Sequence, residues 1–216
     1  MGEMRTNLQM ALLVAGISVA ALVAPSCSGQ SPAGPQDSVA RAELHDNMRK
    51  LWEDHIVWTR SVIVSVSAGL PDTGPVTDRL LRNQTDIGDA IKPYYGDAAG
   101  DQLSALLREH IVGAATVLAA AKAEDDVKLG AAKVAWYANG DSIAAFLNRA
   151  NPVSWPLASM QTMMREHLDL TLAEAVAQLE GHYPESIEHY DSVHTAILAM
   201  ADMLSDGIVK QYPRQF

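Results

Sequence analysis

Residues 51–56, LWEDHI, decide the fold, because the same pattern returns as LLREHI at 106–111 and as MMREHL at 163–168. Each copy places a histidine directly after an acidic residue and among apolar ones. The three histidines, His55, His110 and His167, are separated by 55 and 57 residues. This spacing indicates three successive copies of one structural unit, longer than the unit of the common helical-hairpin solenoids.

Each histidine is predicted to face the protein interior. On an α-helix, the positions four and three residues before a side chain, and four and seven after it, lie on its own face. These positions are mostly apolar in all three copies: Leu51, Trp52, Thr59 and Val62; Leu106, Leu107, Ala114 and Val117; Met163, Met164, Thr171 and Glu174. A histidine on such a stripe is a core residue, whereas the acidic residue before it points to solvent.

The chain from residue 38 onward has helical periodicity, and no segment alternates in the manner of a strand. We expect helices at about 39–68, 76–92, 97–122, 125–149, 156–181 and 184–210, with Pro93 ending the second. Short connections favour antiparallel neighbours. The predicted fold is therefore all-α, an antiparallel bundle of about six helices built from three tandem hairpins. An open array of hairpins is the alternative.

The second helix of each hairpin carries a polar residue on its apolar stripe. Asn83 and Asn139 occupy the same position in the first two hairpins, and Asp86 lies near the first of them. The third hairpin lacks this asparagine and has Glu174 and His194 instead. A buried carboxylate needs a partner, so Glu174 is predicted to contact a metal, His194 or an arginine.

Two interpretations of these residues remain open. In the first, the histidines are structural, and the asparagines satisfy their ring nitrogens. In the second, the three imidazoles converge and bind a metal ion or small ligand, with Glu174 and His194 as further ligands and Asn83, Asp86, Asn139, Thr59 and Thr171 as supporting polar groups. Imidazole suits zinc, iron, nickel and copper, and the methionines beside His167 would also suit copper(I).

No established catalytic motif is present. The sequence contains no Glu-x-x-His, no His-Glu-x-x-His, no Gly-x-Ser-x-Gly and no phosphate-binding loop. We therefore assign no catalytic residue, and we expect a noncatalytic binding protein. A metal-dependent enzyme is an alternative that requires an open coordination position.

The net charge limits the kinds of molecule that the protein can bind. The 216 residues carry a net charge of −10, which repels phosphate backbones and makes nucleic acid an unsuitable partner. If the histidines are structural, the alternative function is a scaffold that binds another protein of the cell envelope. The sequence does not define an oligomeric state.

The N-terminus is typical of an export signal. A short polar start is followed by the apolar run MALLVAGISVAALVA, and Cys27 stands just beyond it. Residues 1–27 resemble a bacterial lipoprotein signal, which implies lipidation of Cys27 and anchoring in the periplasm or at the cell surface. Ordinary secretion is the alternative. We expect a signal peptide at 1–26, a flexible tether at 27–38 and the helical domain at 39–216.

Several stretches resemble a family of small bacterial all-helical proteins that has no assigned activity. They include LWEDHIVWTRSVI, LLRNQTDIGDAIKPYYG, LLREHIVGA, IAAFLNRANP and MMREHLDLTLAEAVA. Some similar chains carry a glycosyltransferase label, but the strand-borne carboxylate motifs of such enzymes are missing here. The resemblance covers about 45–213 and implies the boundaries of the fold without implying any catalytic residue.

Overall fold

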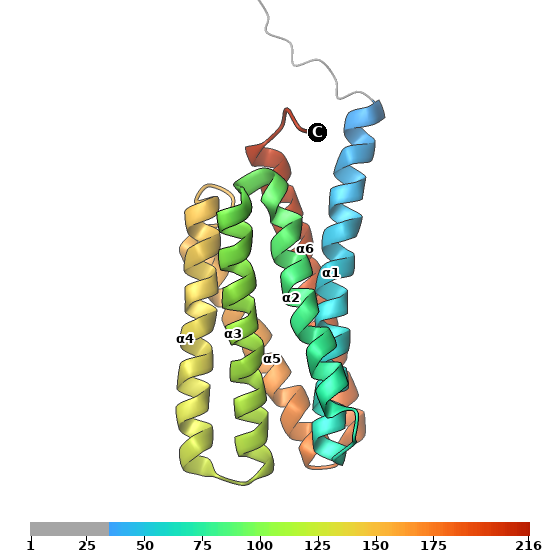
Figure 1. Ribbon diagram of the computed structural model, residues 1–216, viewed down its shortest axis with the longest axis vertical. Coiled ribbons are helices and arrows are strands. Elements are labelled where there is room, and N and C mark those ends of the chain that lie inside the picture. Colours follow the sequence, from blue (N-terminus) through green and yellow to red (C-terminus); the bar gives the residue numbers. More distant parts are fainter. Residues whose placement is uncertain (1–34) are drawn as a thin grey trace, which may run out of the picture. The chain divides into compact units, whose positions relative to one another are not determined.

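The computed structural model describes residues 35–216, and this part of the chain is built from six α-helices (Figure 1). They are α1 (Pro35–Ala68), α2 (Thr73–Tyr95), α3 (Asp97–Lys122), α4 (Asp126–Ala150), α5 (Leu157–Leu179) and α6 (Tyr183–Gln211). The expected all-α fold is confirmed. The expected signal peptide and the lipidation site at Cys27 lie outside the described residues.

Several helix boundaries differ from those expected, and two of the differences have a clear location in the sequence. Helix α2 continues through Pro93 to Tyr95. Proline removes only its own N–H group, and a residue after the proline supplies the hydrogen bond that completes the final turn. The N–H of Gly96 bonds the carbonyl of Lys92 at 2.9 Å, and Gly96 has a φ of 83°. Helix α1 begins at Pro35, inside the segment expected to be a tether.

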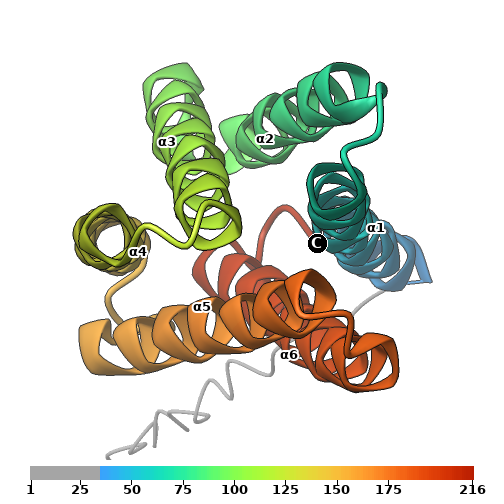
Figure 2. The same cartoon turned by 90° about the horizontal axis from the view of Figure 1, so that it is seen from below.

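The helices form a closed ring. Each packs against its neighbours in the chain, and α6 packs against α1, so the three hairpins do not form an open array. Figure 2 shows this ring from one end. The first helices of the hairpins, α1, α3 and α5, run in the same direction and also contact one another in the interior. Residues at equivalent positions on these three helices are thereby brought to the same level of the bundle.

Close helix packing depends on glycine where α2 meets α3. A Cβ atom on Gly88 would lie 2.5 Å from the carbonyl oxygen of Gly100, and one on Gly100 would lie 2.6 Å from the carbonyl oxygen of Gly88. No side chain fits at such distances, so the two backbones approach each other only because both residues are glycine. This contact fixes the α2–α3 pair that leads from the first hairpin into the second.

Helix α3 is the most apolar of the long helices in the ring. Among the described helices, it alone is long and apolar enough to cross a membrane by length and composition. Its residues Leu103 and Leu107 belong to the main hydrophobic core, and Ile111 belongs to a smaller cluster beside it. Core helices of folded domains pass the same test, and 39% of the apolar window of α3 is buried, so a single helix of this kind is weak evidence for a membrane span.

Candidate metal centre

The three repeated histidines meet in the centre of the bundle. His55 comes from α1, His110 from α3 and His167 from α5, and all three are buried, with exposed fractions of 2%, 3% and 5%. One ring nitrogen of each lies within 4.8 Å of the corresponding atoms of the other two. The ring centroids are 5.8 to 6.4 Å apart. Parallel helices with the same register therefore produce a triad that can hold a metal ion.

Burial keeps the triad uncharged. Desolvation, aided by His110, lowers the pKa of His55 to about 3. Desolvation also lowers the pKa of His110 to about 4 and that of His167 well below its usual range. At neutral pH each imidazole is consequently neutral and has one nitrogen with a free lone pair. Neutral imidazole is the form that binds metals, so no proton competes with an ion at this site.

Two ring nitrogens of the triad have unsatisfied hydrogen-bonding capacity. Nδ1 of His55 and Nδ1 of His167 are buried and have no hydrogen-bond partner in the described part of the chain. Such atoms are rare in a folded protein and are costly unless they have a partner. In a tetrahedral site with bonds of about 2.0–2.1 Å, two ligand nitrogens are roughly 3.3 Å apart. The ligand nitrogens of the triad lie within 4.8 Å of one another, so the three imidazoles could hold a metal ion if they moved closer together.

The asparagines of the second helices have a shared role that the sequence reasoning had not specified. Nδ2 of Asn83 donates to the carbonyl of Leu51 at 3.0 Å, and Nδ2 of Asn139 donates to the carbonyl of Leu106 at 3.1 Å. Each acceptor lies four residues before a histidine of the triad. The asparagines thus fix the histidine-bearing helices at equivalent points of the first two hairpins.

The predicted His–Asn pairing is found in only one of these hairpins. Oδ1 of Asn139 lies 3.2 Å from Nδ1 of His110, which orients that imidazole. In the first hairpin, Oδ1 of Asn83 instead accepts from Nε2 of Gln84 at 3.2 Å. His55 therefore lacks the asparagine partner that the sequence suggested for it.

Gln84 is a neighbour of the triad that the sequence reasoning missed. Its side chain is fully buried and lies close enough to His55 for hydrogen bonding to oppose part of the fall in the pKa of that histidine. Among the described residues, however, neither Oε1 of Gln84 nor Nδ1 of His55 forms a hydrogen bond of normal geometry. Gln84 follows Asn83 directly and so lies at the edge of the apolar stripe of α2. That position was the one feature of the sequence that could have indicated its burial.

Aromatic residues enclose the triad. The ring of Trp52 lies 5.7 Å from that of His55, in an edge-on arrangement. The ring of Trp136 lies 5.4 Å from that of His110, and its Nε1 donates to the carbonyl of His110 at 3.1 Å. These contacts hold the imidazoles in an apolar environment.

The structure places the other predicted ligands away from the triad. Glu174 is buried and accepts a hydrogen bond from Nη1 of Arg60 at 3.0 Å. Burial raises the pKa of Glu174, and Arg60 counteracts this rise. His194 is half-buried and pairs with Glu53 at 3.0 Å. Asp86 is exposed on α2.

The two predicted threonines do lie next to the triad, but they bond to backbone. The hydroxyl of Thr59 donates to the carbonyl of His55 at 2.7 Å, and that of Thr171 donates to the carbonyl of His167 at 2.8 Å. They support the helices that carry the histidines, and their hydroxyl hydrogens do not reach the imidazoles.

No protein-family model matches this chain, and neither curated proteins nor solved structures give a match. The chemistry of the site therefore carries the functional argument.

Proposed function

We propose that this protein binds a single transition-metal ion through His55, His110 and His167. The observation that carries the proposal is the convergence of three buried neutral imidazoles, with ligand nitrogens within 4.8 Å of one another. In addition, two ring nitrogens form no hydrogen bond of normal geometry with any residue in the described part of the chain. A purely structural buried histidine would have both nitrogens satisfied, as the Asn139 contact begins to do for His110. Metal coordination would supply a partner that residues 35–216 do not provide.

The charge of the site limits the ion. The triad contains no carboxylate, and the buried carboxylate of Glu174 is paired with Arg60. A bare divalent ion in this apolar interior would carry uncompensated charge, which is costly. We therefore propose either copper(I), or zinc, iron or nickel that also carries a hydroxide or another anion. In a four-coordinate ion, three imidazoles leave one position for that ligand.

Metal content after loading and dialysis tests the proposal. The full-length protein is loaded with zinc, copper(I), nickel or iron(II), dialysed, and analysed by elemental mass spectrometry. We expect one ion per chain in the wild type and none in His55→Ala/His110→Ala/His167→Ala. The matched control is His45→Ala/His182→Ala/His194→Ala, which removes three histidines outside the triad and should retain the ion. A wild type that retains none of these metals would contradict the proposal and favour a structural role.

A second pair of variants tests the site in finer detail. Asn139→Ala removes the hydrogen bond to His110, and we expect metal affinity to fall by about 10- to 100-fold, as is usual when the residue orienting a ligand is lost. Asn83→Ala removes an equivalent backbone contact and no contact to a histidine, so its effect on affinity should be smaller. Equal effects in competition titrations would argue against an orienting role for Asn139.

We also propose that the protein is exported and anchored by a lipid on Cys27. The support is the apolar run followed by that cysteine. The mass of the mature protein from membranes tests this: we expect a chain that begins at residue 27 and carries acyl groups. A Cys27→Ser chain should no longer be acylated. An unmodified cysteine in the mature wild type would support ordinary secretion.

A further inference from the structure

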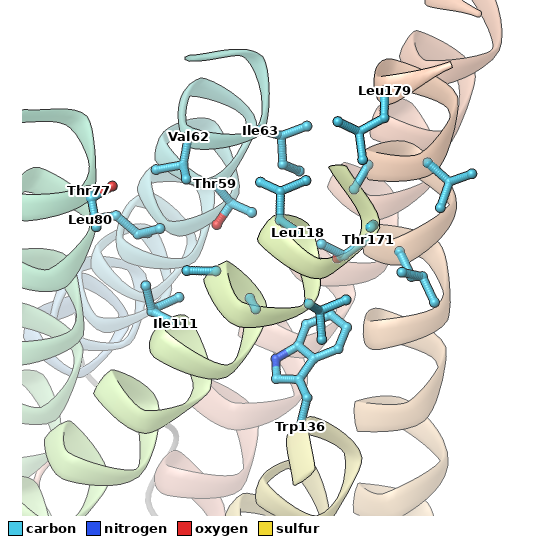
Figure 3. A pocket seen from close by; sticks show the side chains of 17 residues that line it. Thr59, Val62, Ile63, Thr77, Leu80, Ile111, Leu118, Trp136, Thr171 and Leu179 are labelled. Carbon is cyan, nitrogen blue, oxygen red and sulfur yellow. The ribbon is translucent and has the colours of Figure 1, made fainter. Parts of the chain in front are cut away.

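An apolar cavity lies in the bundle beside the histidine triad (Figure 3). It is lined by α1, α2, α3, α4 and α5, and most of its lining side chains are aliphatic. The lining residues Ala115 and Val176 are exposed, so the cavity opens to solvent on that side. Figure 3 shows Val62, Ile63, Leu118 and Leu179 around it, with the indole of Trp136 at one side. The cavity is therefore built from several hairpins at once, as the histidine triad is.

The cavity lies one helical turn from the triad. Thr59, Ala114 and Thr171 line it, and each follows a histidine of the triad by four residues on the same helix face. One turn of helix is about 5.4 Å. Trp136 contacts both features, because its ring packs against His110 and also lines the cavity. A molecule in the cavity would consequently lie next to an ion on the histidines.

The polar side chains around the cavity have no free donors. The hydroxyls of Thr59, Thr77 and Thr171 each donate to a backbone carbonyl, and Nε1 of Trp136 donates to the carbonyl of His110. Water is retained in a cavity only where several polar partners are available to it. This lining therefore favours an apolar occupant over water or a charged molecule.

The size of the cavity limits the occupant. About 50 Å³ is available to the centre of a water-sized molecule, which is room for roughly three to five waters when each needs about 10–15 Å³. This space matches a single small ring or a short branched alkyl chain. It is too small for a lipid tail or a peptide segment.

We propose that this cavity binds a small, uncharged, apolar organic molecule of one-ring size. The inference goes beyond metal binding, because the cavity lining includes none of the three histidines and needs no ion to bind such a molecule. When a metal is present, the bound molecule would lie beside it. The protein would then hold an ion and an apolar ligand in adjacent sites.

Calorimetric titration with toluene tests the proposal, using full-length protein with and without metal. We expect saturable binding with a dissociation constant on the order of 0.1–1 mM, typical of a small ligand that makes only apolar contacts. Benzoate, which has the same ring and a charge, should bind at least about tenfold more weakly because its carboxylate finds no donor. No saturable toluene binding, or equal binding of benzoate, would overturn the proposal.

Two variants connect the binding to this cavity. Ala175→Leu adds three carbons to a buried lining residue, and we expect it to weaken toluene binding by about tenfold or more while the metal is retained. The control is Ala119→Leu, the same change at an exposed position of α3, which should leave toluene binding unchanged. Unchanged binding in Ala175→Leu would place the ligand elsewhere and overturn the assignment.

The variants also separate this proposal from metal binding. His55→Ala/His110→Ala/His167→Ala should lose the ion and still bind toluene. Leu118→Ala enlarges the cavity, and it should improve binding of the two-ring ligand naphthalene relative to toluene. If Ala175→Leu does not fold, this shift in preference still decides the matter, and its absence would count against the cavity as the site.

Discussion

The two ends of the bundle interior, on either side of the histidine triad, are packed differently. At the aromatic end, large side chains leave a void of only about 20 Å³; they include Met48, Trp52, Tyr95, Phe146, Trp155 and Leu204. At the cavity end, alanine, valine and threonine predominate, and about 50 Å³ remains open. Helices α1 to α4 line both regions, whereas α5 lines only the cavity and α6 only the aromatic end. The side chains at the cavity end are the smaller ones. The tightly packed aromatic end therefore stabilises the fold, whereas the cavity end leaves room for a ligand.

Ring contacts and hydrogen bonds hold the aromatic end together. The ring of Tyr95 packs against those of Trp155 and Tyr212, and Nε1 of Trp155 donates to the carbonyl of Met203 at 3.3 Å. Nδ2 of Asn151 donates to the carbonyl of Gly207 at 2.9 Å, which fixes the α4–α5 connection on α6. A rigid end of this kind can hold the triad in register while the other end accommodates a ligand.

The largest change in the free energy of unfolding is expected at acidic pH, where protonation of the triad favours the unfolded chain. The unfolded chain protonates its histidines near pH 6.5, whereas His55 and His110 resist protonation down to about pH 3 and pH 4. Their contribution to stability is therefore complete above about pH 6.5 and is lost as the pH falls. Between pH 6.5 and its own pKa in the folded protein, each of these histidines lowers the free energy of unfolding by roughly 1.4 kcal/mol for every pH unit of acidification. Urea unfolding of the metal-free protein, repeated at several pH values from 7 to 5, measures this loss of stability.

Replacing one member of the triad provides the control for the acid effect. His110→Gln removes a titrating group, so the free energy of unfolding should fall less steeply with acid than in the wild type. A wild-type stability that is unchanged between pH 7 and pH 5 would show that the triad does not remain neutral in the folded protein.

A matched pair of leucine truncations sharpens the comparison between the two ends. Leu204→Ala at the aromatic end should lower the free energy of unfolding by about 4–5 kcal/mol, the upper part of the usual range, because its neighbours are tightly packed. Leu118→Ala should cost only about 2–3 kcal/mol, since this side chain already borders open space. Equilibrium denaturation gives both values. A larger loss for Leu118→Ala would reverse the proposed difference in packing.

The smallest effects are expected when side chains are enlarged. Ala144→Leu in the filled part of the core should lower the free energy of unfolding by about 1–3 kcal/mol through overpacking. Ala175→Leu should leave it unchanged or raise it by less than about 1 kcal/mol, because the added carbons enter the cavity. Thermal unfolding compares the two variants directly, and equal destabilisation would mean that the cavity is not available to a larger side chain.

The fold was largely predictable from the sequence because helical periodicity and an internal repeat are local patterns. The repeat also predicted that His55, His110 and His167 occupy equivalent inward positions, and the ring of three hairpins brings them together. Helix ends were less certain: Pro93 looked like a terminator, yet Gly96 closes the last turn beyond it.

The partners of the polar residues were harder to foresee, because they depend on how helices are rotated against one another. Glu174 shares the apolar stripe of His167, but it lies two turns further along α5 and meets Arg60 of α1. Gln84 follows Asn83 directly and still turns into the core. No spacing rule gives such contacts between different helices, and the cavity likewise emerges only when small residues of five helices face one another.

X-ray absorption spectroscopy of the metal-loaded protein tests the central claim most directly. The account predicts a first coordination shell that contains three imidazole nitrogens at about 2.0–2.1 Å for zinc, and the loss of this signal in His55→Ala/His110→Ala/His167→Ala. A shell made of oxygens without imidazole, or a spectrum that is unchanged in the triple variant, would contradict it and would leave the triad as a polar element of the core.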